Sequence, residues 1–560
     1  MTIEHSRMLL YNNTLLIAMK FSSCKFVIST AAILLLLHTY VKASAQSASS
    51  TPDNSAFILT PPAPESPQIN GPKIYGARPD ADFLYRIPAT GVRPMTFSAE
   101  GLPKGLKLNP ETGIITGKVR HEGTYEVTLH AKNAKGRDNR TLRIVIGDKI
   151  ALTPPMGWNS WNCWGNTVSQ EKVMSSAKAM IEKGLVEYGW SYINIDDGWQ
   201  GLRGGKYNAI QPNSKFGDMK ALGDSLHAFG LKFGIYSGPW TATYAGHIGE
   251  SSDTPDGKYD FVEKGIVDEY WKLDRSKLKR DSLWYFTRYR HELSDARQWS
   301  DWGVDYLKYD WNPNDHYHLK LMADALAKAD RDIVYSISNS SHVSLGASLK
   351  KYAQCWRTTG DIRDSWESMS KIGFEGQDRW AGFREPGNWP DADMLVVGKV
   401  GWGPKTHWTK LTPDEQFTHI SLWAMMASPL LIGCDMAELD DFTISLLCNR
   451  EIIDINQDEL GLQAVHIYGN ETYATYLKPL SDGSVAIAMF NLSDKPQKIG
   501  FIPKSLKLVT TQIVRDVWRQ KDIAEVKINE RWETEVAPHG VCVVKLSPGY
   551  INGPISGFVK

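Results

Sequence analysis

The feature that most constrains the fold is a regular alternation of short apolar stretches with helix-like stretches from Pro154 to about residue 432. The apolar stretches have the length and the aromatic and β-branched content of buried strands. Strands are expected at 157–159, 192–195, 232–236, 305–309, 333–337, 355–357, 394–397 and 430–432, with helices such as 171–182, 219–229, 319–329 and 413–427 between them. Eight strands alternating with helices over about 300 residues predict an α/β chain with a (β/α)8 TIM barrel. An open doubly wound sheet is the alternative, but no glycine-rich phosphate loop follows the first strand.

The segments on either side of this region predict β structure. Residues 71–149 carry short period-two strands separated by turn residues, which predicts an immunoglobulin-like (Ig-like) β-sandwich. The helical pattern stops after Gln463, and period-two strands predict a C-terminal antiparallel β-sandwich over residues 463–560. The barrel is then expected over 150–462. Residues 46–70, rich in Ser, Pro and Ala, are expected to be a linker.

The N-terminus has the pattern of an export signal over residues 1–45. Lys20 and Lys25 precede an apolar run from Phe26 to Leu37, and small residues at 43–45 offer a cleavage site. The run is too short to span a bilayer, and no later stretch is apolar enough to do so. Met19 is a more natural start than Met1. We expect an exported protein, periplasmic or extracellular.

Composition gives no support for some classes of partner. The chain has 63 basic and 63 acidic residues, which gives no electrostatic argument for binding nucleic acid or an anionic membrane. Its 20 Trp suit surfaces that stack on sugars. Five cysteines follow the signal segment without a CxxC pair, and most are expected to be buried free thiols. No cofactor motif is present, and the sequence leaves the oligomeric state open.

Carboxylates follow the even-numbered strands of the predicted barrel. Asp196 and Asp197 end the second strand, Asp310 ends the fourth, and Asp361 follows the sixth. Alternate strands of such barrels contribute to the same layer, so these acids should converge at the C-terminal mouth. Two other interpretations of these acids remain. Asp310 could cap the next helix, or the acids could hold Mg²⁺ or Ca²⁺, although Lys308 would compete with a divalent ion.

Paired carboxylates with aromatic walls and no expected metal suit glycoside hydrolysis. One acid protonates the leaving oxygen while the other attacks or stabilises the oxocarbenium-like centre. Lys308 and Arg357 are the cations nearest these acids in sequence. Three tryptophans near the ends of the first two strands are expected to wall the pocket: Trp158, Trp161 and Trp199.

The barrel region closely resembles glycoside hydrolase family 27, the α-galactosidase or melibiase group. The motifs that carry the resemblance occur at nearly every predicted barrel strand. They are the segments 154–162 (PPMGWNSWN), 193–199 (INIDDGW), 231–236 (LKFGIY), 301–310 (DWGVDYLKYD), 356–361 (WRTTGD), 364–366 (DSW), 391–395 (DADML) and 455–458 (INQD). The N-terminal module resembles the Ig-like modules that precede bacterial polysaccharide-degrading enzymes, and it is either a spacer or a sugar-binding unit.

The resemblance implies a role for each matching residue. Asp310 matches the nucleophile and Asp361 the general acid/base. We expect Asp310, beside a lysine, to be ionised and Asp361 to hold a proton. The implied substrate contacts are Asp196 and Asp197 to the 4- and 6-hydroxyls, Lys308 to O3 and O4, Arg357 near O2, and Trp161 and Tyr236 as aromatic pocket residues.

The sequence departs from the family pattern in three places. Asn312 and Tyr244 stand where many relatives have a disulfide-bonded cysteine pair. Ser251–Glu292 is a long insertion after the third strand, expected either to border the pocket mouth or to be a disordered surface loop. Ser338 stands where α-galactosidases have a glutamate that contacts the 2-hydroxyl.

The resemblance implies a retaining exo-α-galactosidase that acts on terminal α-galactosyl groups of oligo- and polysaccharides. α-N-Acetylgalactosaminidase is the first alternative, and the family also contains β-L-arabinopyranosidases and isomaltodextranases. A carbohydrate-binding protein that has lost its chemistry is the alternative from another class, and the intact Asp310 and Asp361 argue against it.

Overall fold

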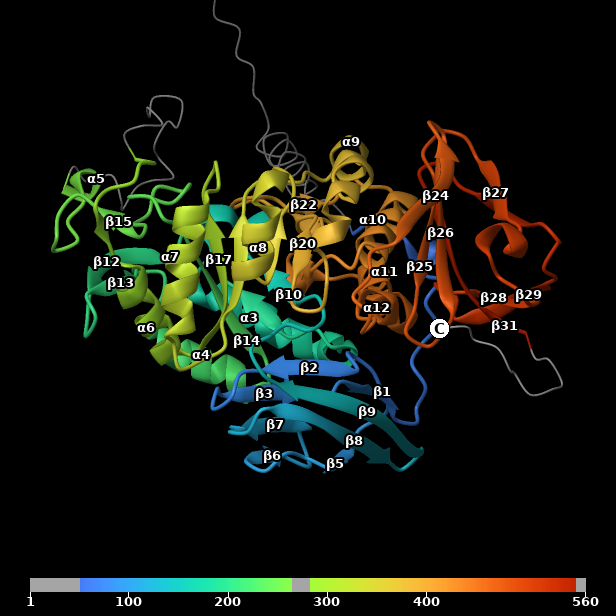
Figure 1. Cartoon of the computed structure of the whole chain (residues 1–560), viewed down its shortest axis with the longest axis horizontal. Helices are drawn as coiled ribbons and strands as arrows, with labels where there is room; N and C mark the ends of the chain where they lie inside the picture. The colour runs from blue at the N-terminus through green and yellow to red at the C-terminus, as the bar shows by residue number, and fades with distance from the viewer. Residues whose placement is uncertain (1–50, 264–282, 550–560) are drawn as a thin grey trace, which may run out of the picture. The chain divides into compact units, whose positions relative to one another are not determined.

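The computed structural model describes residues 51–263 and 283–549 (Figure 1). The predicted export signal, residues 1–45, and the middle of the 251–292 insertion lie outside the described residues.

A parallel eight-stranded sheet forms the central part of the described chain. Its strands follow each other in chain order, except that the last one pairs with the first. In sheet order they are β20 (Trp389–Asp391), β19 (Cys355–Arg357), β18 (Val334–Ser338), β17 (Val304–Asp310), β14 (Lys232–Ser237), β11 (Tyr192–Asn194), β10 (Met156–Asn159) and β23 (Leu430–Ile432). A parallel bridge from Leu395 to Ile432 joins the segment after β20 to β23. This sheet confirms the predicted (β/α)8 barrel.

The seventh barrel strand is not where the sequence predicts it. The apolar segment 394–397 is buried but contributes only the bridge at Leu395, and the strand itself is β20, five residues earlier. Pro390 lies in the middle of β20, and a proline within a short run argues against a strand on sequence grounds. The prediction of a strand at 394–397 was therefore wrong by about one strand length.

Helices connect the barrel strands, and most of them begin at a side-chain cap. Ser169 caps α3, Asp218 caps α4, and Thr412 forms a capping box with Glu415 at the start of α10. The longer helices are α3 (Gln170–Glu182), α4 (Met219–Ala228), α6 (Glu292–Trp302), α7 (His316–Ala327) and α10 (Pro413–Met425). The shorter ones are α2 (Trp161–Trp164), α5 (Asp260–Glu263), α8 (Gly346–Tyr352), α9 (Trp366–Ser370), α11 (Asp441–Leu447) and α12 (Arg450–Asn456).

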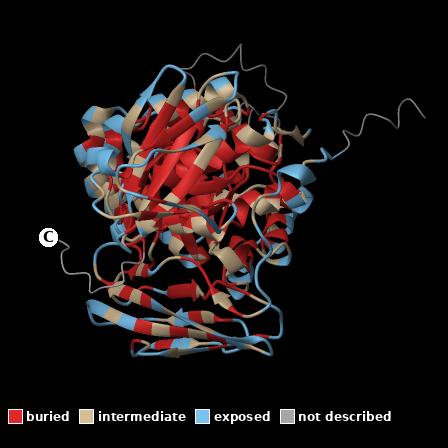
Figure 2. Cartoon of the chain, turned by 90° about the vertical axis from the view of Figure 1, so that its right-hand side faces the viewer, coloured by how far each residue is buried: buried red, intermediate tan, exposed pale blue. Residues whose placement is uncertain are grey.

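Burial separates the strands from the helices that surround them. All seven residues of β17 are buried, whereas α7 buries one face, formed by Leu319, Met322, Ala325 and Leu326. Figure 2 shows the strands as the buried interior and the exposed residues on the helices and loops. This pattern is what a parallel sheet covered by helices requires, because both faces of its strands are apolar.

The N-terminal part contains two small sheets. One has the strands β2 (Ile74–Ala77), β9 (Gly136–Ile146), β8 (Gly123–Asn133) and β5 (Thr96–Glu100), and the other has β3 (Phe83–Arg86), β7 (Ile114–Gly117) and β6 (Leu106–Leu108). Their buried side chains form a hydrophobic cluster of their own, as expected for an Ig-like sandwich. A separate two-stranded pair joins β1 (Gln68–Ile69) to β4 (Ala89–Thr90).

The C-terminal part is antiparallel, as predicted. Its larger sheet has the order β24 (Val465–Asn470), β25 (Tyr473–Pro479), β26 (Val485–Asn491), β31 (Val541–Pro548), β28 (Gln512–Asp516) and β29 (Lys521–Val526). A second sheet pairs β27 (Gln497–Phe501) with β30 (Trp532–Val536). Three two-stranded antiparallel sheets lie among the barrel loops: β12 (Gln200–Gly204) with β13 (Ala209–Pro212), β15 (Ser251–Ser252) with β16 (Tyr289–Arg290), and β21 (Lys399–Val400) with β22 (His407–Trp408).

Two sequence-based expectations can be compared directly with the described residues. Within them, no helix is both long enough and apolar enough to cross a membrane. The five cysteines after the signal segment are free, and four of them are buried: Cys163, Cys355, Cys434 and Cys448.

Candidate active site

The predicted acids lie at the C-terminal ends of neighbouring or nearby barrel strands. Asp310 is the last residue of β17, Asp196 and Asp197 follow β11 after one intervening residue, and Asp361 follows β19. Asp310 does not cap the next helix, because Asp315 occupies the cap position of α7 and accepts a hydrogen bond from the His318 amide. The helix-cap interpretation of Asp310 is therefore excluded.

Asp310 is buried and has one engaged oxygen. The Tyr236 hydroxyl, from the end of β14, donates to Asp310 Oδ2 at 3.0 Å. Oδ1 is buried and has no hydrogen-bond partner among the described residues. Burial raises the pKa of Asp310 to about 7, against the opposing effect of Lys308. One carboxylate oxygen is thus oriented and the other is available to react.

Lys308 is held by Asp196 rather than by Asp310. Its Nζ lies 2.8 Å from Asp196 Oδ2, and Asn159 Nδ2 donates to the same oxygen at 2.9 Å. Burial opposes the charge on Lys308, but Asp196 and Asp310 outweigh it and raise the lysine pKa above its usual value. Lys308 therefore stays charged beside the carboxylates.

Asp197 is oriented by the loop that follows β14. Thr243 Oγ1 donates to Asp197 Oδ1 and the Ala245 amide donates to Oδ2, each at 2.7 Å. Burial raises the pKa of Asp197 to about 7, although both hydrogen bonds favour its ionised form. This carboxyl group has its two oxygens fixed in direction before any sugar binds.

Asp361 contacts a guanidinium group. Arg357 Nη2 donates to Asp361 Oδ1 at 3.1 Å, and about half of the Asp361 side chain, 48%, is exposed. Burial opposes ionisation, but Arg357 outweighs it and holds the pKa of Asp361 below its usual value. In the free protein the two acids therefore have the opposite order from the one expected, because burial acts mainly on Asp310 and the arginine acts on Asp361.

Asp393 belongs to this site, and the sequence reasoning gave it no role. Its Oδ1 lies 2.8 Å from Arg357 Nη1, and its Oδ2 accepts the amide of Ile362, the residue after Asp361. The backbone of Asp393 has φ of 82°, an uncommon conformation for a residue other than glycine. The available signal was the Asp391-Ala-Asp393 motif, which ends the seventh strand. Placing that strand at 394–397 hid the signal, because it put both acids at the wrong end.

The aromatic residues divide between the core and the site. Trp158 and Trp199 are fully buried, and the Trp199 indole donates to the Tyr236 carbonyl and contacts Trp302 of α6 edge-on. With no exposed surface, neither can stack on a sugar, so the prediction that they wall the pocket was wrong. Trp161, at the start of α2, is only half-buried.

Ser338 is the last residue of β18 and is buried. It stands directly opposite Asp310 in the parallel pairing of β17 with β18, and Lys308 pairs with Ser336 in the same register. Residues two apart on a strand share a face, so Ser338 lies on the same side of the sheet as Ser336. Ser336, Lys308 and Arg357 line one small cavity inside the barrel.

Comparison with known proteins gives the family of the chain. Fold and site together define a glycoside hydrolase. The family described as "Alpha galactosidase A" matches residues 153–283 and 278–458, and its "C-terminal beta sandwich domain" matches residues 470–546. The chain belongs to the α-galactosidase family, glycoside hydrolase family 27. A family described as "Putative Ig domain" matches residues 40–147.

Three similar proteins represent the matches. Alpha-galactosidase 2 of Arabidopsis thaliana is 33% identical over 412 residues, which are 72% of this chain and 91% of that protein. The crystal structure of "a putative alpha-galactosidase/melibiase" from Bacteroides fragilis has a TM-score of 0.75 at 36% identity and covers 88% of this chain and 99% of its own. A β-L-arabinopyranosidase from Geobacillus stearothermophilus has a TM-score of 0.61 at 28% identity and covers 72% and 98%.

Proposed function

We propose that the protein is a retaining exo-α-galactosidase that releases terminal non-reducing α-D-galactosyl groups. The observation that carries the proposal is the arrangement around Asp310, which ends a strand beside the charged Lys308 and the carboxylates of Asp196 and Asp361. Its buried Oδ1 has no hydrogen-bond partner among the described residues. Relatives named as α-galactosidases, similar over most of their length, support this substrate.

In this mechanism Asp310 is the nucleophile and Asp361 the acid/base. Asp310 attacks the anomeric carbon while Asp361 gives its proton to the leaving oxygen, which forms a β-galactosyl ester on Asp310. Asp361 then takes a proton from water as that water attacks the ester, and the α-anomer is released. The Tyr236 hydroxyl orients the nucleophile through its bond to Oδ2.

The free protein holds the proton on the wrong acid for this first step. Because the pKa of Asp310 is about 7 and that of Asp361 is below its usual value, the proton that the pair holds below about pH 7 is on Asp310. The reaction needs the same proton on Asp361. Part of the work of substrate binding is therefore to draw Arg357 away from Asp361, as a sugar 2-hydroxyl would do by accepting from the guanidinium group.

A second candidate substrate is the α-N-acetylgalactosaminyl group. Ser338, opposite Asp310, is smaller than the glutamate that the family resemblance implies at this position, which leaves room beside the 2-position of the sugar. Asp196, Asp197 and Lys308 address hydroxyls that the two sugars share, so they do not favour the N-acetyl sugar. We rank galactose first because the relatives that match over most of their length are named α-galactosidases.

A panel of nitrophenyl glycosides tests the proposal and the ranking. The purified enzyme should hydrolyse the α-galactoside with a higher kcat/KM than its N-acetyl analogue, the β-L-arabinopyranoside or the α-glucoside. A preference for the N-acetyl substrate of about tenfold, or 1.4 kcal/mol in the transition state, would exchange the first and second candidates. Hydrolysis of none of them would refute the proposed activity.

We also propose that the protein is exported to the periplasm or the extracellular space. The support is the basic and then apolar N-terminal sequence before the small residues 43–45. Mass spectrometry of the mature N-terminus and cell fractionation test this proposal. An uncleaved N-terminus on a cytoplasmic protein would contradict it.

A further inference from the structure

One short turn sets the direction of both Asp197 oxygens. Thr243 and Ala245 donate to the two oxygens at 2.7 Å each. The turn closes on itself, because the Thr243 amide donates to the His247 carbonyl at 2.7 Å and the His247 amide donates to Thr243 Oγ1 at 3.0 Å. Any movement of residues 243–247 therefore moves the partners of Asp197.

The end of the insertion holds this turn from outside. The Thr241 amide donates to the Tyr285 carbonyl and the Ala242 amide to the Leu283 carbonyl, each at 3.0 Å. The Trp284 indole Nε1 donates to the Thr243 carbonyl at 2.8 Å. Thr243 thus bonds Asp197 with its hydroxyl and Trp284 with its carbonyl.

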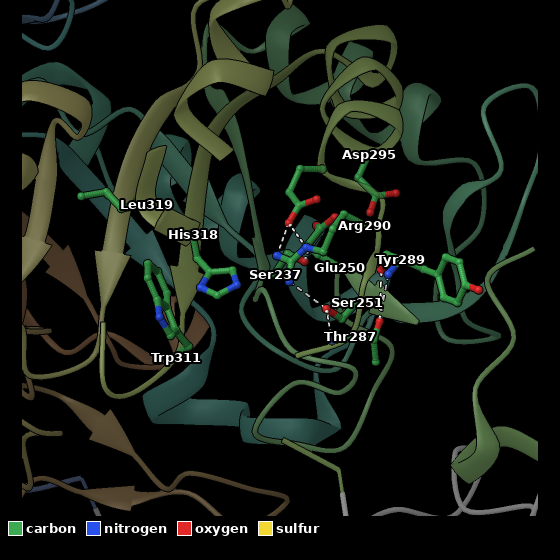
Figure 3. Close-up of polar contacts among 12 residues, drawn as sticks. Ser237, Glu250, Ser251, Thr287, Tyr289, Arg290, Asp295, Trp311, His318 and Leu319 are labelled. Carbon is green, nitrogen blue, oxygen red and sulfur yellow. Dashed lines mark hydrogen bonds and ion pairs between the residues drawn. The ribbon is translucent and has the colours of Figure 1, made fainter. Parts of the chain in front are cut away.

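Segment 283–290 is itself fixed to the barrel. β16 pairs with β15, the Thr287 amide donates to Ser251 Oγ at 3.2 Å, and Arg290 Nη1 donates to the same oxygen at 2.8 Å (Figure 3). One residue before Ser251, the buried Glu250 accepts from the Ser237 hydroxyl at the end of β14 at 2.9 Å. A continuous set of hydrogen bonds therefore runs from β14 through the insertion ends to the turn that donates to Asp197.

We propose that Trp284 is a positioning residue for the sugar, acting through Thr243 to fix the carboxylate of Asp197. The inference rests on the proposed function, in which Asp197 binds sugar hydroxyls, and it gives the insertion a role in binding the non-reducing sugar. Trp284 touches neither Asp197 nor the reacting atoms, so its effect depends on the rigidity of the turn.

Hydroxyl contacts away from the reacting carbon form in the bound substrate and persist in the transition state. Loosening Asp197 should therefore raise KM and leave kcat nearly unchanged. Thr243→Val removes a hydrogen bond to a buried carboxyl group and should raise KM about tenfold to a hundredfold. Trp284→Phe keeps an aromatic ring at this position but removes one neutral hydrogen bond, and it should raise KM about threefold to tenfold.

The test measures kcat and KM on whichever nitrophenyl α-galactoside or N-acetyl analogue the wild type hydrolyses. Thr243→Ser keeps the hydroxyl and should stay within about twofold of wild type. Trp532→Phe is the matched control, because Trp532 is a partly buried tryptophan of β30 that contacts Phe501. The double variant Thr243→Val/Trp284→Phe should have a KM within about twofold of that of Thr243→Val alone, because both substitutions act on the same turn.

Several results would overturn the inference. The inference is wrong if Trp284→Phe has the same KM as Trp532→Phe, or if it lowers kcat at constant KM. It is also wrong if the effects of the two substitutions on KM are fully additive in the double variant. Hydrogen–deuterium exchange of the 241–247 peptide should rise in Trp284→Phe and not in the control, and an unchanged rate would also refute it. If Trp284→Phe does not fold, Thr241→Val, which removes the Thr241 hydroxyl bond to the Leu283 carbonyl, should still raise KM. A wild type inactive on every substrate refutes the proposed function instead.

Discussion

Replacing Asp310 with asparagine should abolish turnover and stabilise the folded protein at alkaline pH. Asp310 is only 7% exposed, and burial raises its pKa from 3.8 to about 7. The folded state holds the Asp310 proton more tightly than the unfolded chain does. The protonated carboxyl group therefore adds to the free energy of unfolding below pH 3.8, and this stabilisation is lost as the pH rises through about 7. A shift of about three pKa units corresponds to a loss of at most about 4 kcal/mol of wild-type stability between low and high pH. Asparagine is neutral at every pH, so the variant does not lose this stability.

Thermal unfolding at about pH 5 and pH 8, with activity measured on the same samples, checks this prediction. The melting temperature of Asp310→Asn relative to that of wild type should be higher at about pH 8 than at about pH 5. Asp305→Asn is the control on the same strand, because Arg331 outweighs burial there and lowers the pKa of Asp305, so losing that carboxylate should destabilise the protein. If the melting-temperature difference between Asp310→Asn and wild type does not increase with pH, then Lys308 offsets the effect of burial on the pKa of Asp310. More than a few per cent of activity would place the nucleophile elsewhere.

Three further predictions follow from the site. Asp361→Asn should lower kcat about 10²–10⁴-fold on substrates with poor leaving groups, with azide restoring turnover on activated ones, and an equal loss for every leaving group would contradict its role. Its stability should change by less than about 1 kcal/mol in a melting experiment, because the side chain is half-exposed. The wild-type kcat/KM should fall above about pH 7, where the Asp310–Asp361 pair loses its single proton, and a profile still rising at pH 8.5 would refute this. Ser338→Glu should shift kcat/KM towards the galactoside and away from its N-acetyl analogue by about tenfold, measured on the two nitrophenyl substrates, and an unchanged ratio would show that Ser338 does not face the sugar.

The sequence predicted the barrel because every strand is buried between helices, and this burial leaves a periodic apolar signal. The same signal did not locate the seventh strand, β20, because Pro390 interrupts the apolar pattern there although pairing with β19 still forms a strand. Misplacing β20 also hid Asp393. Trp158 and Trp199 were assigned to the pocket because a strand-end position does not tell which side chains are covered by later segments.

The electrostatics of the site could not be read from neighbours in the sequence. Lys308 is two residues from Asp310, but its amine bonds Asp196, from another strand, and burial decides the pKa of Asp310. The link from Trp284 to Thr243 joins residues about forty positions apart through one side-chain hydrogen bond. No local pattern encodes such a contact.

The anomeric configuration of the first product tests the central proposal most directly. Asp310 and Asp361 end or follow two strands of one barrel layer, which favours a carboxyl separation of about 5–5.5 Å and a covalent intermediate. Proton NMR of the enzyme acting on nitrophenyl α-galactoside should show α-galactose forming first, with the β-anomer appearing only as mutarotation proceeds. Initial release of β-galactose would contradict double displacement and the assignment of Asp310 as the nucleophile.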